Sequence, residues 1–177
     1  MVRSKGFRSK GFPRKGYWAQ AALAVIVLAN VSAPRLSGAE APALTITLLD
    51  GKSITLGAAE IEKLPHTVDD VSFATEHGPQ HAVFDGPLLW AVLDQSGAFA
   101  GMGPRQQIGH VAIVTGRDGY QADIALGEIS PEFEGKPVIL AERKDGAALG
   151  EGHLRLIVPG DRHGGRDVQN VVSITLR

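Results

Sequence analysis

The chain has 177 residues, of which 44% are hydrophobic and 21% charged, and its formal net charge is −1 at pH 7. It contains no cysteine, which excludes disulfides and every site that needs a protein thiolate as a metal ligand or nucleophile. Residues 1–39 hold seven of the eighteen cations and none of the nineteen anions, so residues 40–177 carry a formal charge of −8 and a nucleic-acid partner is not expected.

The first 39 residues have the pattern of a secretory signal peptide. A basic segment precedes the apolar run 18–31, and the small residues Ser37-Gly38-Ala39 follow as a cleavage site. An uncleaved membrane anchor is the alternative, but Gln20 and Asn30 interrupt the run, which is shorter than the roughly 20 apolar residues that span a bilayer. We therefore expect Sec-type export to the periplasm or the medium, with no stable membrane anchor after cleavage.

Residues 40–177 are expected to form one domain, held by its hydrophobic core alone because disulfides are excluded. Period-two alternation predicts strands, Asp-Gly pairs predict hairpin turns, and an apolar stripe predicts one clear helix. The first half of the domain is predicted to contain a hairpin of 43–48 and 53–56, a helix over 58–63, and strands 68–75 and 81–84 around a turn at Gly78-Pro79. A helix over 87–95, capped by Asp85 or Gly86, follows. The second half is predicted to contain a hairpin of 111–114 and 120–124, a helical turn over 126–129, and strands 138–142, 154–158 and 171–176.

Many short strands with a few short helices, and no regular alternation of strand and helix, indicate an α+β fold dominated by mixed or antiparallel sheet. The order and spacing of the segments 86–93, 118–120, 138–141 and 154–159 resemble the oxidoreductase molybdopterin-binding domain of the sulfite oxidase family. The resemblance covers roughly residues 65–176. It implies a compact mixed α+β domain in which backbone groups, histidines and arginines hold a pyranopterin and one cysteine ligates molybdenum.

The segment 164–170 resembles the family's Gly-Ala-Arg-Ser-Val-Lys-Trp, in which the arginine and the lysine help to hold the cofactor. Arg166 matches the arginine, whereas Gln169 and Asn170 stand at the lysine and tryptophan positions. The metal-ligating cysteine would be expected within 71–81, where no thiol is present, and hydroxyl or imidazole groups are not equivalent donors.

The signal peptide also lacks the adjacent arginine pair typical of export with a bound cofactor. Together with the missing thiol, this suggests that the sheet was kept while the redox centre was lost or never acquired. We therefore expect no cofactor. Molybdopterin is the alternative that the resemblance implies.

A basic, glycine-containing loop near the end of the chain is the best candidate binding site. Its guanidinium, imidazole and backbone groups suit a phosphate, sulfate, carboxylate or pterin. The alternative is a solvated loop whose arginines pair with Asp161 and Asp167. The candidate cofactor-binding residues are Arg155, Arg162, His163, Gly164, Gly165 and Arg166.

A metal site at His77 and His81 is a second alternative. The two histidines are four residues apart, but Gly78-Pro79 between them prevents a helix from placing both on one face. No serine lies in a Gly-x-Ser-x-Gly frame, so a serine hydrolase is not expected and catalytic residues stay unassigned.

Three functions remain open at this stage. The first is an exported molybdopterin-binding-domain-like protein without cysteine-ligated molybdenum that binds a pterin or an anion. The second is a non-catalytic accessory module for a partner protein of the cell envelope. The third is a molybdopterin-dependent oxidoreductase whose cofactor is held by the pterin alone, so the sequence leaves open whether the chain is an enzyme.

Overall fold

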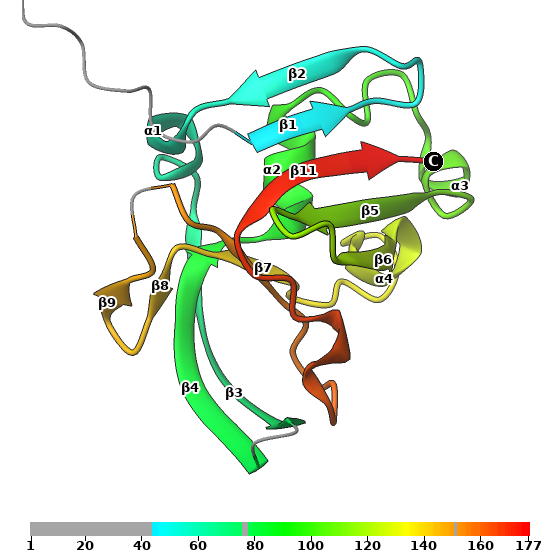
Figure 1. The fold of residues 1–177 in the computed structure, drawn as a ribbon. Coiled ribbons are helices and arrows are strands. Elements are labelled where there is room, and N and C mark those ends of the chain that lie inside the picture. The colour runs from blue at the N-terminus through cyan, green and yellow to red at the C-terminus, as the bar shows by residue number, and fades with distance from the viewer. Residues whose placement is uncertain (1–43, 76–77, 151) are drawn as a thin grey trace, which may run out of the picture. The chain divides into compact units, whose positions relative to one another are not determined.

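Strands arranged in three sheets form the framework of the structure, a computed structural model that describes residues 44–75, 78–150 and 152–177 (Figure 1). All of these residues belong to the compact unit Ser37–Arg177. The predicted signal peptide, residues 1–39, lies outside the described residues. The strands and few short helices confirm the α+β class expected from the sequence.

The largest sheet has five strands in the order β2-β1-β11-β5-β6. Its last strand in the chain lies in the middle, parallel to β1 and antiparallel to β5. Alternation of apolar and polar residues along β1 buries Leu44 and Ile46, while the polar residues between them face outward. The strands of this sheet are β1 (Leu44–Thr47), β2 (Ser53–Leu56), β5 (Val111–Gly116), β6 (Gln121–Ala125) and β11 (Val171–Leu176).

The second sheet is dominated by a long two-stranded ribbon. β3 (His66–Thr75) and β4 (Gly78–Pro87) pair antiparallel along their whole length, and β4 also pairs with β8 (Arg143–Lys144). β8 continues into β9 (Ala147–Ala148) through a tight turn. The turn residues Asp145 and Gly146 have φ of 51° and 78°, the left-handed backbone that a two-residue hairpin turn needs.

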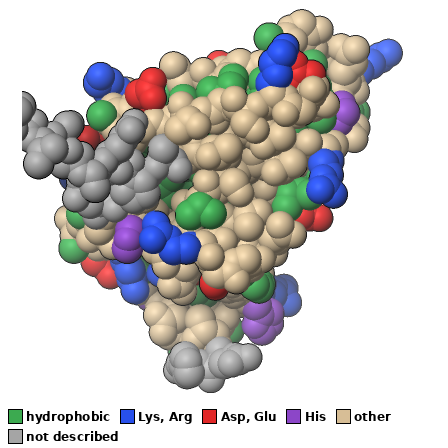
Figure 2. Space-filling model, turned by 45° about the horizontal axis from the view of Figure 1, so that its top comes forward, with side chains coloured by type: hydrophobic (Ala, Val, Ile, Leu, Met, Phe, Trp, Pro, Cys, Tyr) green, Lys and Arg blue, Asp and Glu red, His purple; other side chains and the backbone are tan. Residues whose placement is uncertain are grey.

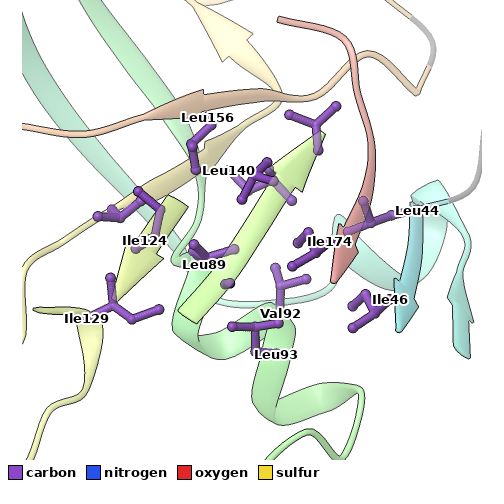
Figure 3. Packing of buried hydrophobic residues seen from close by; sticks show 14 of the residues in the cluster. Leu44, Ile46, Leu89, Val92, Leu93, Ile124, Ile129, Leu140, Leu156 and Ile174 are labelled. Atoms are coloured by element: carbon purple, nitrogen blue, oxygen red, sulfur yellow. The ribbon is translucent and has the colours of Figure 1, made fainter. Parts of the chain in front are cut away.

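The third sheet pairs β7 (Ile139–Ala141) with β10 (Arg155–Ile157), and β7 is buried on both faces. Helix α2 (Leu89–Gln95) packs its apolar stripe against the five-stranded sheet, so that Val92 and Leu93 lie among Ile46 and Ile174 (Figure 3). The remaining helices are the single turns α1 (Ala58–Ile61), α3 (Pro104–Gln107), α4 (Leu126–Ile129) and the 3₁₀ turn η1 (Gly164–Arg166). No helix in the described ranges is long and apolar enough to cross a membrane.

Two local predictions were wrong. Gly78 and Pro79 belong to β4, where they pair with Thr75 and Ala74 of β3. Pro87 ends β4 instead of opening the helix, and the N-cap is Leu88. The backbone N–H of Leu89 donates to Val138 O at 2.8 Å, so tertiary pairing with the segment before β7 fixes where the helix begins.

α1 is shorter than predicted, and α3 and β9 were not predicted, because each is a single turn or a two-residue pair with little sequence signal. The core around α2 includes residues of both hairpins of the five-stranded sheet. A smaller cluster between the ribbon and β7 contains Val71, Phe84 and Ile139, together with Ile157 of β10. The ribbon is therefore attached to the rest of the unit through β7 and β10.

The seam between β4 and β7 requires a glycine. A Cβ on Gly86 would lie 2.4 Å from Leu140 O and 2.8 Å from Ala141 Cα. Both are backbone atoms, so relieving the clash would require the strand itself to shift. We predict that Gly86→Ala lowers the free energy of unfolding by about 2–3 kcal/mol, because the two strands must separate. Urea unfolding of both proteins measures the difference.

Gly109→Ala is the matched control, since its Cβ would meet only Gln106 O, at an ordinary 3.6 Å. Its free energy of unfolding should stay within about 0.5 kcal/mol of wild type. Equal losses of unfolding free energy in the two variants would show that the contact between β4 and β7 does not require a glycine at position 86.

Candidate functional site

The loop between β10 and β11 lies against the end of β3. The backbone N–H of Ala74 donates to Arg162 O at 2.9 Å, and Ala74 and His163 form an isolated parallel bridge. The end of β3, which belongs to the segment where the resemblance predicts a cysteine, and the basic loop 162–166 therefore lie side by side. Sequence reasoning named both segments, and the fold brings them to one place.

Two surface pockets of about 320 Å³ each open where the ribbon and the loop meet. They share Thr75 and Gly164, so they are neighbours on either side of this contact. The first is lined by Ala74, Thr75, His163, Gly164 and Gly165, and the second by Phe73, Thr75, Gln80, Arg155, Gly164, Asp167 and Gln169.

Gly164 allows the loop to approach the ribbon closely. A Cβ at this position would lie 3.0 Å from two ring carbons of Phe73, tighter than ordinary van der Waals contact. The next glycine has open space around it. Packing therefore requires a glycine only at position 164. Gly165 lines the first pocket and adds no side chain to it.

Arg166 is held within an ion-pair network. Its Nε and Nη2 donate to the two carboxylate oxygens of Asp161 at 2.8 and 2.7 Å, and its Nη1 lies 3.1 Å from Glu128 Oε2. Lys136 Nζ donates to Glu128 Oε1 at 2.8 Å. The network ties the loop to α4, and Arg166 is not among the residues that line the two pockets.

The charges of this network perturb one another. The hydrogen bonds from Arg166 hold the pKa of Asp161 below its ordinary value, and the Asp161 carboxylate raises the pKa of Arg166 further. Burial acts to raise the pKa of Glu128, but hydrogen bonds from Lys136 and Arg166 outweigh it and lower the pKa. Asp161, Glu128 and Arg166 are therefore charged at neutral pH.

Arg155 is also paired within the protein. Its Nε donates to Asp167 Oδ1 at 2.6 Å, its Nη2 contacts Asp167 Oδ2, and its guanidinium carbon lies 5.3 Å from the centre of the Phe84 ring. Arg155 and Arg166 thus make the pairings with Asp167 and Asp161 that were the alternative from the sequence. They build the loop, and their charges are largely neutralised within it.

Arg162 and His163 have no side-chain hydrogen bond or ion pair with the described residues, and both are exposed. His163 lines the first pocket, and Arg162 precedes it in the chain. Of the four cationic or imidazole side chains predicted for this site, these two have no side-chain partner among the described residues, so all of their donors are available to a ligand.

The alternative metal pair, His77 and His81, is only half within the described residues. His77 lies outside them, and His81 Nε2 lies 2.6 Å from Asp70 Oδ1 on the exposed face of the ribbon. No group of three or more His, Cys, Asp or Glu side chains in the described ranges is arranged to hold a metal ion. The chain also has no thiol, so the residues present do not fit a cysteine-ligated molybdenum centre.

Sequence reasoning missed three residues that support the loop. Tyr120 donates its hydroxyl to Gly165 O at 2.5 Å, and Glu128 and Lys136 extend the network around Arg166. Tyr120 and Glu128 lie 45 and 38 residues from their partners in the loop, and no periodicity or short motif marks such contacts. Basic and acidic side chains are scattered singly over the face shown in Figure 2, so this face has no broad basic patch among its described residues.

Comparison with known proteins supports the fold. No protein-family model and no curated protein matches the sequence. Among solved structures, the sulfane dehydrogenase SoxCD from Paracoccus pantotrophus is similar at a TM-score of 0.59 and 18% identity, over 76% of this chain and 37% of that chain. This likeness shows the fold, and it agrees with the resemblance to an oxidoreductase molybdopterin-binding domain. The chain spans just over a third of the length of the SoxCD chain it matches.

The Arg166 network predicts acid-dependent stability. Arg166→Met should lower the free energy of unfolding at pH 7 by about 2–3 kcal/mol, because Asp161 and Glu128 lose a shared charged partner. Both carboxyl pKa values are lowered on folding from ordinary values of 3.8 and 4.5, so their stabilisation is complete above those values and is lost as pH falls through the lower folded-state values. Urea unfolding at pH 7 and near pH 3 should show the difference shrinking in acid.

Lys52→Met is the matched control, because Lys52 pairs with Asp50 at 2.8 Å but its side chain is 79% exposed. Exposed pairs contribute about 0–1 kcal/mol, so this variant should differ little from wild type. A loss in Arg166→Met no larger than in the control would contradict the structural role of the network.

Proposed function

We propose that this chain is an exported protein with a sulfite oxidase-like molybdopterin-binding fold that binds a pterin or another small anionic ligand without cysteine-ligated molybdenum. The contact between Ala74 and Arg162 carries the proposal, because it brings the loop to the pockets. His163, Gly164 and Gly165 line the first pocket, and Gly164 also lines the second. The ligand would lie between the end of the ribbon and the loop 162–166.

The exposed side chains of the loop would supply the anion contacts. A guanidinium donates paired hydrogen bonds that match a phosphate, sulfate or carboxylate, and an imidazole N–H adds a further donor. Arg162 and His163 have these groups available. Arg155 and Arg166 act mainly as positioning residues, since Asp167, Asp161 and Glu128 already accept their hydrogen bonds.

The second pocket suits the flat part of a ligand. It combines the ring of Phe73 with the side-chain amides of Gln80 and Gln169 and the ion pair between Arg155 and Asp167. An aromatic ring offers stacking, while amides and the carboxylate offer donors and acceptors to the edge of a heterocycle. Each pocket falls at the small end of the range for small-molecule sites.

Export follows from the predicted signal peptide at residues 1–39, and a Sec-type route would carry an unfolded chain without a bound cofactor. Redox chemistry at molybdenum is not part of the proposal, because no residue of the chain supplies the sulfur ligand. A stoichiometric amount of molybdenum in protein purified from its native compartment would contradict this and would favour a cofactor held by its pterin alone.

A non-catalytic accessory module of the envelope is the second candidate. The observation that favours it is the pairing of Arg155 and Arg166 within the loop, which leaves fewer free cations for a ligand than the sequence suggests. In this case the pockets would be empty remnants, and a partner protein would be the ligand.

Ligand-dependent stability separates the two candidates. We predict that millimolar pyrophosphate, sulfate or 6-carboxypterin raises the thermal midpoint of the wild-type protein, since a ligand that binds only the folded state stabilises it. The double variant Arg162→Ala/His163→Ala should bind the active probe at least about tenfold more weakly, as expected when charged hydrogen bonds are removed. Differential scanning fluorimetry and isothermal titration calorimetry measure the two effects.

Arg105→Ala is the matched control, because Arg105 is an exposed arginine on α3, away from the loop (Figure 1). It should respond to the probes as wild type does. If no probe shifts the wild-type midpoint, or if Arg105→Ala loses the shift equally, the binding proposal fails and the accessory module is favoured.

A further inference from the structure

His66 lies between two carboxylates at the base of the ribbon, away from the loop 162–166. Its Nδ1 is 2.9 Å from Asp85 Oδ1, and its Nε2 is 3.2 Å from Glu142 Oε2. The side chains of His66, Asp85 and Glu142 are only 24%, 26% and 18% exposed. The three residues come from the start of β3, the end of β4 and the link between β7 and β8, so the imidazole connects three segments.

The surroundings of the imidazole are mostly acidic. Burial raises the pKa of Glu142, and the charges of Glu62 and Asp85 raise it further, while His66 and Arg143 act in the opposite direction. Glu142 Oε2 has no hydrogen-bond partner among the described residues, so its 3.2 Å contact with His66 Nε2 is a close approach without hydrogen-bond geometry. Glu62, Asp85, Glu142 and Arg143 are the charged groups around this site.

The number of protons on the imidazole decides whether both contacts are favourable. A neutral imidazole has one N–H and one lone pair, whereas an imidazolium has an N–H on each nitrogen. Only the charged form directs an N–H toward both an ionised Asp85 and an ionised Glu142. The neutral form turns a lone pair toward one of the carboxylates, which is repulsive in a partly buried site.

We propose that His66 is a proton-dependent clasp. When it is protonated, it fastens the base of the β3–β4 ribbon to the link between β7 and β8, and when it is neutral the link loosens. The clasp sits beside backbone contacts of the same segments: Glu142 N–H donates to Asp85 O at 2.9 Å, and Asp85 pairs with Arg143 in the sheet. Histidine is suited to this role because its charge normally changes between pH 5 and 8.

The sign of the effect follows from the contacts. A histidine that gains carboxylate partners on folding contributes stability while it is protonated, and this contribution is lost as pH rises and the proton leaves. The raised pKa of Glu142 acts with the same sign, because its protonated form is favoured in the fold and stability falls as pH rises above its ordinary value of 4.5. The clasp is therefore closed in mild acid and open in mild base.

The same face of the ribbon offers a matched control. His81 Nε2 lies 2.6 Å from Asp70 Oδ1, but these side chains are 66% and 62% exposed. Only this one carboxylate is paired with His81 among the described residues. Solvent screens such a pair, so His81 should not contribute to pH-dependent fastening.

Urea unfolding of the purified protein between about pH 5.5 and 8.5 tests the clasp. The wild-type unfolding equilibrium constant should rise with pH on the order of tenfold more than that of His66→Gln, as expected for the loss of one charged hydrogen bond. His81→Gln should keep the wild-type pH dependence. The clasp is refuted if His66→Gln retains the full dependence, or if His81→Gln loses as much of it.

A measurement on the wild-type protein covers the case in which His66→Gln does not fold. NMR follows the His66 ring signals with pH, while hydrogen exchange gives the protection factor of the Glu142 amide. The protection factor should fall on the order of tenfold as the ring loses its proton. A ring that titrates while the protection of the Glu142 amide stays constant overturns the proposal.

Discussion

The close approach of β4 and β7 at Gly86 determines how the parts of this unit are arranged. With no side chain at this position, the backbone of the ribbon lies against the backbone of Leu140 and Ala141, and the bridge between Leu88 and Ile139 continues the contact. β7 also pairs with β10, so the loop that follows β10 starts from a strand fixed to the ribbon. This geometry brings the loop to the end of β3 and creates the two pockets.

Charge is used differently in two parts of the structure. In the loop, Arg155 and Arg166 are matched by carboxylates, so that a chain rich in acidic residues can hold a basic segment in one conformation. At the base of the ribbon the balance is reversed, because two carboxylates share a single imidazole. The pairs of Arg166 keep their charges through neutral pH, whereas the proposed clasp depends on one proton. The fixed ion pairs of the loop and the proposed proton-dependent clasp therefore lie near opposite ends of β3.

The fold class and most strands could be predicted because period-two patterns and Asp-Gly turns are local signals, as at Asp145-Gly146. The start of α2 could not, since it depends on the hydrogen bond from Leu89 to Val138, a contact between distant segments. For the site, composition identified the loop, and the family resemblance singled out Arg166. Its pairing with Asp161, five residues away, was anticipated, whereas its second partner Glu128 lies 38 residues away and leaves no trace in the spacing. The clasp at His66 was missed for the same reason.

The central place of β11 has a consequence for the order of folding. β11 completes the largest sheet by inserting between β1 and β5, so residues from the two extremes of the described chain become direct neighbours, as Thr45 and Ser173 do. Until the final strand is available, β1 and β5 have no partner on their inner edges, and the core around α2 stays open. Such long-range closure slows folding. A nascent polypeptide with this topology should remain unfolded, and thus competent for threading through a translocation channel, until synthesis is nearly finished.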